Sequence, residues 1–335
     1  MSIATELALL ANTKESLRVA IGLSKDVPFS QYASHITPHE ESGAVFDFVG
    51  NQYSKDQLPV NLSDISEFIR LSSATMWKDE QLIEVANDVP RISGEGLLIE
   101  EQRTNLATWS DDALQWGATR GVSFSATAGD GVYSGIVTQV MEDTSDDMHM
   151  WYMASPSSSI GDRHTFSLFI KPASGRSLSI TSNFFTAGHI VFDFDFSTLT
   201  TAITPSNADA SSEVISLGHG FYRVIFSGVS KTARPSNKAY HNLRLTSNSN
   251  ISYVGSGDVG ASVFGYQVEQ DSTSTSYMPT SGTPVTRSPD ILNIPLLPTQ
   301  TIAGDWDDGV TYTAADGIAT FTGHGYIRNI TVEAL

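Results

Sequence analysis

The sequence predicts a mainly β protein, a jelly-roll β-sandwich preceded by a short helical segment. The first observation is a series of short runs that alternate apolar and polar residues, such as residues 166–172 (FSLFIKP) and 221–229 (FYRVIFSGV). This alternation is typical of strands with one buried face. The second is the set of glycine-containing turns between the runs, such as residues 218–220 and 255–257. Many short strands separated by polar turns favour a sandwich.

Four segments follow from the positions of these strands and turns. Residues 1–43 are expected to form a helical segment for attachment or oligomerisation, and residues 44–94 a connecting region. Residues 95–290 are expected to form the sandwich. Residues 291–335 predict a small C-terminal β element, which is too small to be stable alone and should pack on the sandwich or on a neighbouring subunit.

The composition excludes several classes of protein and partner. Apolar residues make up 40% of the chain, which is enough for a core and argues against disorder. The net charge of −18 repels phosphates, so we expect no nucleic-acid partner. The absence of cysteine excludes disulfides and cysteine-based zinc sites. No segment approaches the roughly 18 apolar residues of a membrane span, so none is expected.

The first 23 residues predict an amphipathic helix with a narrow apolar seam. The spacing of its members is that of a coiled coil, which would make this segment an oligomerisation element. The alternative is a helix that packs on its own chain. The seam consists of Ile3, Leu7, Leu10, Lys14, Leu17 and Ile21.

Several segments together resemble a known family. The opening segment is GLLIEEQRTNLATWS (96–110), and the closing segment is YQVEQDSTSTSYMPTSGTPVTR (266–287). Between them lie FSLFIKPASGRSLSI (166–180) and GHGFYRVIFSGV (218–229), in the expected order. These segments resemble the concanavalin-A-like carbohydrate-binding domain of tailed-phage virion proteins.

The resemblance implies a virion structural protein without enzymatic activity. It would be a tail fibre, a capsid decoration protein or a tail adhesin, assembled in the host cytoplasm and exposed on the particle surface. The implied partners are other virion proteins, bound through the N-terminal segment, two further copies in a homotrimer, and a host surface glycan. Two alternatives stay open: a glycan-degrading depolymerase or hydrolase on the same sandwich, and an inert decoration protein.

A polar cluster in the opening segment could suggest catalysis, but strand geometry argues against it. Glu100 and its neighbour Glu101 would point to opposite faces of a strand, so they cannot flank one glycosidic bond. We interpret Glu100, Arg103, Asn105 and Glu269 as a structural polar network. Arg103 is expected to pair with Glu269 or Glu100 where the first and last strands meet, and Asn105 to hold the turn.

Three aromatic residues are candidates for stacking on sugar rings: Trp116, Trp151 and Tyr240. Trp116 stands beside a glycine in an expected loop and is therefore the best surface candidate. The alternative for all three is core packing, which is common for large aromatic side chains in strands.

One acidic segment could supply oxygen ligands to Ca²⁺. Asp143, Asp146, Asp147 and His149 lie close together, but their spacing does not match an EF-hand loop. A solvated acidic loop is the preferred interpretation, and no resident cofactor is expected.

Overall fold

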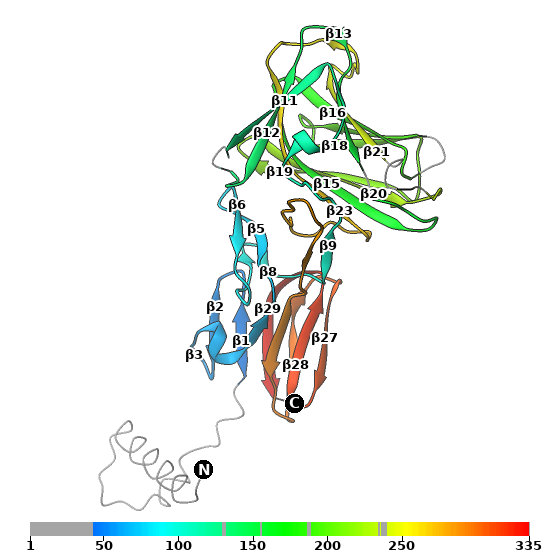
Figure 1. Cartoon of the computed structure of the whole chain (residues 1–335). Helices are drawn as coiled ribbons and strands as arrows, with labels where there is room; N and C mark the ends of the chain where they lie inside the picture. Colours follow the sequence, from blue (N-terminus) through cyan, green and yellow to red (C-terminus); the bar gives the residue numbers. More distant parts are fainter. Residues whose placement is uncertain are drawn as a thin grey trace, which may run out of the picture.

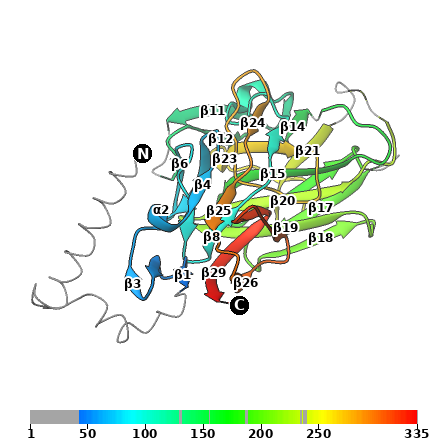
Figure 2. The ribbon, with the colours of Figure 1, turned by 90° about the horizontal axis from the view of Figure 1, so that it is seen from below.

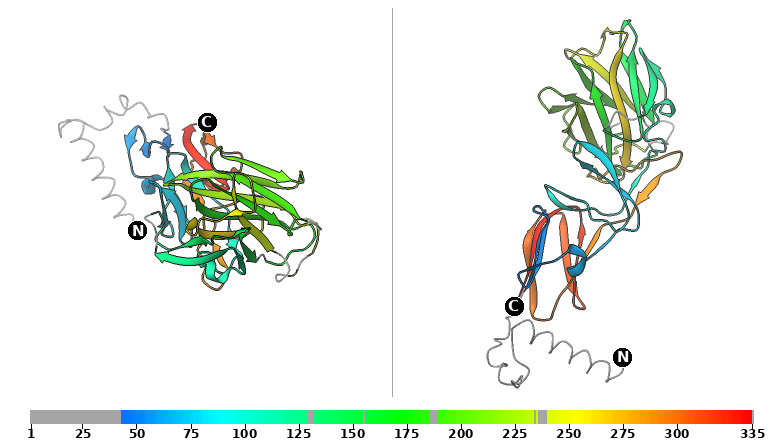
Figure 3. Two further views of the ribbon diagram at one scale, coloured as in Figure 1. Left: turned by 90° about the horizontal axis from the view of Figure 1, so that it is seen from above. Right: turned by 90° about the vertical axis from the view of Figure 1, so that its left-hand side faces the viewer.

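The computed structural model describes residues 43–334, apart from 129–131, 155, 186–188, 234 and 236–239. The described chain folds into two β units, a larger sandwich and a smaller second unit placed below it (Figure 1). The right-hand view of Figure 3 shows that a narrow region connects them. The predicted helical segment with its seam of Ile3, Leu7, Leu10, Lys14, Leu17 and Ile21 lies outside the described residues.

The larger unit is a jelly-roll β-sandwich, which confirms the predicted fold class. Its described residues form two six-stranded antiparallel sheets, here called the β10 sheet and the β11 sheet. In spatial order, the β10 sheet contains β10 (Thr119–Arg120), β14 (His149–Ala154), β21 (Tyr240–Ser247), β16 (Arg176–Ser182), β17 (Ile190–Asp195) and β18 (Thr200–Thr204). The β11 sheet contains β11 (Val122–Ala128), β12 (Ile136–Glu142), β23 (Val259–Glu269), β15 (Arg163–Pro172), β20 (Phe221–Val229) and β19 (Ser211–Gly218).

Alternation within the central strands gives each sheet one core face. Along β15, Phe166, Leu168 and Ile170 point into the core between the sheets, and Val224 and Phe226 do the same from β20. Side chains at the intervening positions of both strands face away from this core, because successive residues of a strand point to opposite sides. The outer face of the β11 sheet is therefore free to contact other parts of the molecule.

The second unit combines the two ends of the described chain. One sheet has the order β3-β2-β1-β29-β8-β7 with β26 also paired to β29, and the other has the order β27-β28-β25-β4. The bounds of the first sheet's strands are β1 (Ala44–Asp47), β2 (Gln52–Lys55), β3 (Leu58–Pro59), β7 (Ile92–Ser93), β8 (Gly96–Ile99), β26 (Gln300–Trp306) and β29 (Gly325–Ala334). Those of the second are β4 (Glu67–Ile69), β25 (Ile291–Pro295), β27 (Val310–Ala315) and β28 (Ile318–Gly323), and the short helix α2 spans Leu62–Ile65.

This architecture differs from the expected connecting region 44–94 and separate C-terminal element 291–335. Phe46 pairs with Ile330 across β1 and β29, and both belong to one buried cluster with Leu97 and Leu292. Figure 2 shows β1, β8, β25 and β29 gathered together when the molecule is viewed from below. Neither segment has enough apolar surface for a core of its own, so each supplies one part of a shared core.

The opening strand also lies elsewhere than expected. The sequence places residues 96–99 at the start of the sandwich, but β8 pairs with β29 of the second unit, with Leu97 opposite Ile327. The sandwich side of the opening segment begins at β9 (Arg103–Asn105), which pairs with β24 (Val285–Arg287). The chain therefore passes between the units twice, after β8 and after β24.

A buried network of ions occupies this double crossing. Arg70, Arg91, Arg287, Glu100 and Asp290 are each at most 3% exposed. Arg91 Nη1 lies 2.8 Å from Glu100 Oε2, and Arg287 Nη2 lies 3.3 Å from the same oxygen. Asp290 pairs with Arg91 and, at 3.2 Å, with Arg70, and accepts a 2.9 Å bond from the Glu100 amide. Burial alone would raise the pKa of Glu100, but the two arginines beside it hold that pKa at about 2.

A hairpin of the second unit also docks on the sandwich. It consists of β5 (Ala74–Lys78) and β6 (Gln81–Val85). Leu82 packs in a small buried cluster with Phe169 and Phe264 of the β11 sheet. Trp77 Nε1 donates a 2.9 Å hydrogen bond to the Leu217 carbonyl.

The ion network predicts a large penalty for removing one charge. Asp290→Asn leaves arginines buried without their carboxylate, so the unfolding free energy should fall by about 3–5 kcal/mol. Chemical denaturation followed by tryptophan fluorescence measures this change. Asp147→Asn is the matched control, because Asp147 pairs with Arg120 at the surface, where ion pairs add little. Equal effects of the two substitutions would contradict a stabilising role for the network.

His241 is buried in the sandwich core against aromatic rings. Its ring centroid lies 4.2 Å from that of Phe166 and 5.0 Å from that of Phe226, and neither ring nitrogen has a hydrogen-bond partner among the described residues. Burial, with a smaller contribution from His164, lowers the pKa of His241 to about 3. The neutral imidazole is therefore the form that the folded core accepts.

This low pKa predicts a loss of stability in acid. Between pH 6.5, its pKa in the unfolded chain, and about 3, its pKa in the folded protein, His241 is protonated in the unfolded chain but neutral in the folded core. Stability should therefore fall by about 1.4 kcal/mol for each pH unit between about 6.5 and 3. His241→Leu should remove this part of the slope in urea titrations at several pH values, whereas the exposed-site control His189→Leu should retain it. An unchanged slope in His241→Leu would contradict the prediction.

Candidate functional site

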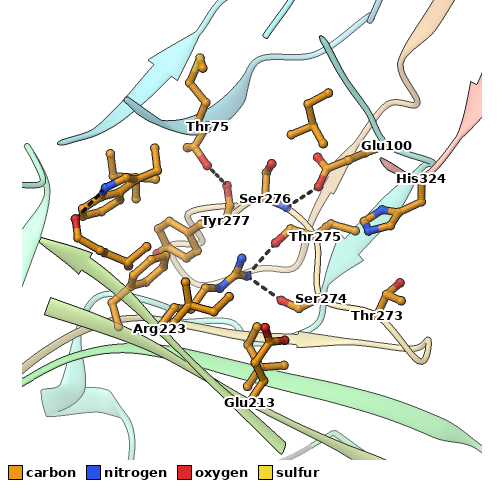
Figure 4. Close-up of a pocket in the computed structure, with 18 of the residues that line it drawn as sticks. Thr75, Glu100, Glu213, Arg223, Thr273, Ser274, Thr275, Ser276, Tyr277 and His324 are labelled. Carbon is orange, nitrogen blue, oxygen red and sulfur yellow. Dashed lines mark hydrogen bonds between the residues drawn. The ribbon is translucent and has the colours of Figure 1, made fainter. Parts of the chain in front are cut away.

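A cavity of about 700 Å³ lies between the sandwich and the second unit. Its walls come from the outer face of the β11 sheet, the β5–β6 hairpin, the segment 271–277, and His324 and Tyr326 of the second unit (Figure 4). A cavity of this size is within the range of small-molecule sites. The ion network lies beside it, because Arg91 and Glu100 also line the cavity.

The sheet wall is built from alternate residues of two neighbouring strands. Val224 and Phe226 of β20 point into the core, so the residues that alternate with them face the cavity. The register places Ser211 opposite Ser227, with their hydroxyl oxygens 2.8 Å apart. The alternate residues of this wall are Ser211, Glu213, Ile215 and Leu217 of β19, and Arg223, Ile225 and Ser227 of β20, with Ser212 of β19 and Phe169 of β15 also in the lining.

The segment 271–277 forms a hydroxyl-rich wall. Glu269, just before it, accepts a 3.0 Å bond from the Thr275 amide and a 2.9 Å bond from Gln267 Nε2. Glu100 Oε1 accepts a 2.8 Å bond from the Ser276 amide. Burial raises the pKa of Glu269, which does not line the cavity. Both carboxylates therefore hold the backbone of the segment in place.

Arg223 connects the sheet wall to this segment. Its Nη2 donates to Ser167 Oγ at 3.0 Å, to Ser274 Oγ at 2.6 Å and to the Thr275 carbonyl at 2.7 Å. Its guanidinium carbon lies 5.4 Å from the Phe169 ring centroid, in cation–π range. Burial lowers the pKa of Arg223. Figure 4 shows the guanidinium among Ser274, Thr275 and Tyr277.

Two half-buried aromatic side chains also line the cavity. Trp77 is stacked on Phe169, with ring centroids 6.2 Å apart and ring planes at 12°. Tyr326 contributes from β29. The cavity thus combines hydroxyl groups, the guanidinium groups of Arg91 and Arg223, and aromatic surface.

The structure corrects two of the three predicted sugar-stacking residues. Trp116 is 6% exposed and Trp151 is fully buried, and both belong to the sandwich core. A sugar cannot reach either ring, because the opposing sheet already covers them. Tyr240 is half-buried on the outer face of the β10 sheet, where its ring lies 6.1 Å from that of Tyr152. Its role in sugar binding stays a prediction.

The predicted polar network is also divided differently. Arg103 pairs with Glu101 at 2.9 Å and with Asp271 at 2.6 Å, rather than with Glu100 or Glu269. The reason is that Glu100 is bound by the arginines of the ion network, and Glu269 binds the Thr275 amide of the segment 271–277. Asn105 joins the opening and closing segments: its Nδ2 donates to the Met278 carbonyl at 2.8 Å, and its Oδ1 accepts from the Val268 amide at 3.0 Å.

Two carboxylates of the acidic segment considered for Ca²⁺ bind protein groups. Asp147 makes two ionic hydrogen bonds with Arg120 Nη2, at 2.7 and 2.8 Å. Asp143 accepts from Ser145 and lies 3.3 Å from His149 Nε2. In the part of the chain that the structure describes, no group of three or more potential ligands is arranged to hold a metal ion.

Neither Arg223 nor the cavity was predicted from the sequence. The available signal was the alternation in residues 221–229, where Arg223 and Ser227 share one face of a strand whose other face is apolar. The β5–β6 hairpin that completes the cavity could not be placed from the sequence, because its contacts are with strands far along the chain.

Comparisons with known proteins add little to this geometry. No protein-family model matches the chain, and no curated protein is similar to it in sequence. Among solved structures, the chain is similar to the CBM22-1–GH10 modules of Clostridium thermocellum endo-1,4-β-D-xylanase 10B, solved with xylohexaose, at a TM-score of 0.28 and 11% identity. The match covers 62% of this chain and 29% of the xylanase structure. Within the described residues, no helix has the length and apolar character of a membrane span.

Proposed function

We propose that the protein binds a glycan in the cavity between its two units. The observation that supports this most strongly is the composition of the walls of the 700 Å³ cavity, which include many serine and threonine side chains together with half-buried Trp77 and Tyr326. Serine and threonine hydroxyls can both donate and accept hydrogen bonds, as sugar hydroxyls do. Aromatic surface beside them suits the apolar face of a sugar ring.

Binding without cleavage is the favoured activity. Glycoside hydrolysis ordinarily needs two opposed carboxyl groups that can act on one bond. Among the cavity-lining residues, Glu100 is held as a carboxylate by two arginines, which leaves Glu213 as the carboxylate without an ion-pair partner. A single such group supports recognition of sugar hydroxyls rather than acid–base catalysis.

We further propose that the protein presents this site on the surface of a tailed-phage particle. The support is the resemblance of the opening segment (96–110) and closing segment (266–287) to those of virion proteins. The N-terminal segment would bind other virion proteins and hold three copies together. Three linked sites would convert weak sugar binding into useful avidity.

The proposed trimer on the phage particle can be tested directly by the mass of the protein in solution. Light scattering coupled to size exclusion should give three times the 36.1 kDa chain mass for the full-length protein. The seam substitution Leu10→Asp should reduce that mass to a monomer, because a buried charge disrupts a coiled-coil interface. A monomeric wild-type protein at high concentration would contradict the trimer.

Filling the cavity tests the glycan site. Ile215→Trp places a larger side chain on the cavity wall at a position that is 36% exposed, so folding should be preserved. Ile251→Trp is the matched control, because Ile251 is 44% exposed and lies outside the cavity. A glycan array should identify a ligand, and titration calorimetry should then show binding weakened by at least about tenfold in Ile215→Trp alone.

Other outcomes have equally clear meanings. Unchanged binding by Ile215→Trp together with loss of binding by Tyr240→Ala would move the site to the outer face of the β10 sheet. Absence of binding to every glycan on an array that includes host surface polysaccharides would overturn the proposed function.

A further inference from the structure

We infer that the ligand of the cavity carries a carboxylate, as uronic and sialic acids do, and that Arg223 binds that group. This inference rests on the proposed glycan-binding function and narrows its ligand class. It follows from the hydrogen-bond inventory, the charge environment and the position of Arg223.

The guanidinium of Arg223 has donors that the protein does not use. A guanidinium has five N–H groups, and all three hydrogen bonds of Arg223 are made by Nη2. Nε is buried and has no acceptor. Nη1 has no acceptor among the described residues, and the residue lines the cavity. Nε is closed off from the cavity, so Nη1 is the unused donor that is open to a ligand.

The charge of Arg223 also lacks a close partner. No carboxylate of the described residues lies within 4.0 Å of its nitrogens. Glu269 is buried and accepts hydrogen bonds from Thr275 and Gln267, and Glu100 is paired with two arginines. Glu213 is exposed on the neighbouring strand, at a diagonal position in the register. Arg223 is half-buried, and a partly desolvated cation without a close counterion has a cost that a ligand carboxylate would reduce.

The surroundings of Arg223 fix its plane and supply further donors. Phe169 lies beneath the guanidinium, and Ser167 and Thr275 hold its Nη2. Planar guanidinium groups bind carboxylates with directional, charge-assisted hydrogen bonds. Hydroxyls of Ser274 and Ser276 line the same cavity and could bind neighbouring sugar oxygens.

Arg244 provides a matched control within the same domain. It is half-buried on β21 of the β10 sheet, and its Nε is also buried without an acceptor. It forms no ion pair with the described residues, and burial lowers its pKa as it does for Arg223. Arg244 does not line the cavity, so its substitution tests for a general effect of losing an arginine.

The first experiment changes the ligand and leaves the protein intact. Oligogalacturonides, hyaluronan oligosaccharides and sialyllactose are each compared with their carboxyl-reduced forms by titration calorimetry on the full chain. At least one acidic form should bind about tenfold or more tightly than its reduced form, the loss expected for one ionic hydrogen bond. Equal binding of both forms would overturn the carboxylate inference and leave the proposed function standing. Binding of no glycan, acidic or neutral, would overturn both.

The second experiment assigns the preference to one residue. Arg223→Gln should bind the acidic and reduced forms with equal affinity, because the charge that distinguishes them is gone, and Arg223→Lys should retain part of the preference. Arg244→Gln should behave as the wild type. Distortion of the segment 271–277 would weaken both ligand forms equally. Equal weakening by Arg223→Gln, or loss of the preference in Arg244→Gln, would overturn the assignment to Arg223.

Discussion

The buried network of Arg70, Arg91, Arg287, Glu100 and Asp290 is the interaction on which the arrangement of the molecule depends. It lies where the chain passes twice between the sandwich and the second unit: Glu100, Arg287 and Asp290 come from the two crossings, and Arg70 and Arg91 from the segments on either side of the β5–β6 hairpin. Buried ion pairs are expensive to desolvate and often add little net stability. Their directional bonds can instead fix one geometry, and here they fix how the two units meet.

The cavity is a consequence of that geometry. Glu100 binds two arginines through one oxygen and the Ser276 amide through the other, so the network and the hydroxyl-rich segment 271–277 share one residue. The β11 sheet supplies the opposite wall because its outer face, unlike its core face, mixes polar and apolar residues. A single alternating pattern in β20 thus builds the core with Val224 and Phe226 and the cavity wall with Arg223.

Local pattern in the sequence was enough to predict the sandwich, because alternation and turns are properties of neighbouring residues. The partners of strands were not predictable in this way. Residues 96–99 were assigned to the sandwich, yet Leu97 pairs with Ile327, and nothing near residue 97 encodes that distant partner. Likewise, Trp116 seemed a surface residue beside a glycine, but the fold covers it.

The partners of charged side chains at the site were also not predictable from neighbouring residues. Arg103 and Arg223 each look like an ordinary arginine on a strand. Only the tertiary structure shows that Arg103 has two carboxylate partners, whereas Arg223 has none within ion-pair distance among the described residues. Residue type alone carries no information about such differences. The site was therefore not predicted from the sequence, although strands of its β11-sheet wall were recognisable.

A crystal structure of the full chain with an oligosaccharide bound at saturating concentration is the most direct measurement of the central claim. The account predicts sugar density in the cavity, in contact with β19, β20 and the segment 271–277. Sugar density on the outer face of the β10 sheet around Tyr240, with an empty cavity, would contradict it.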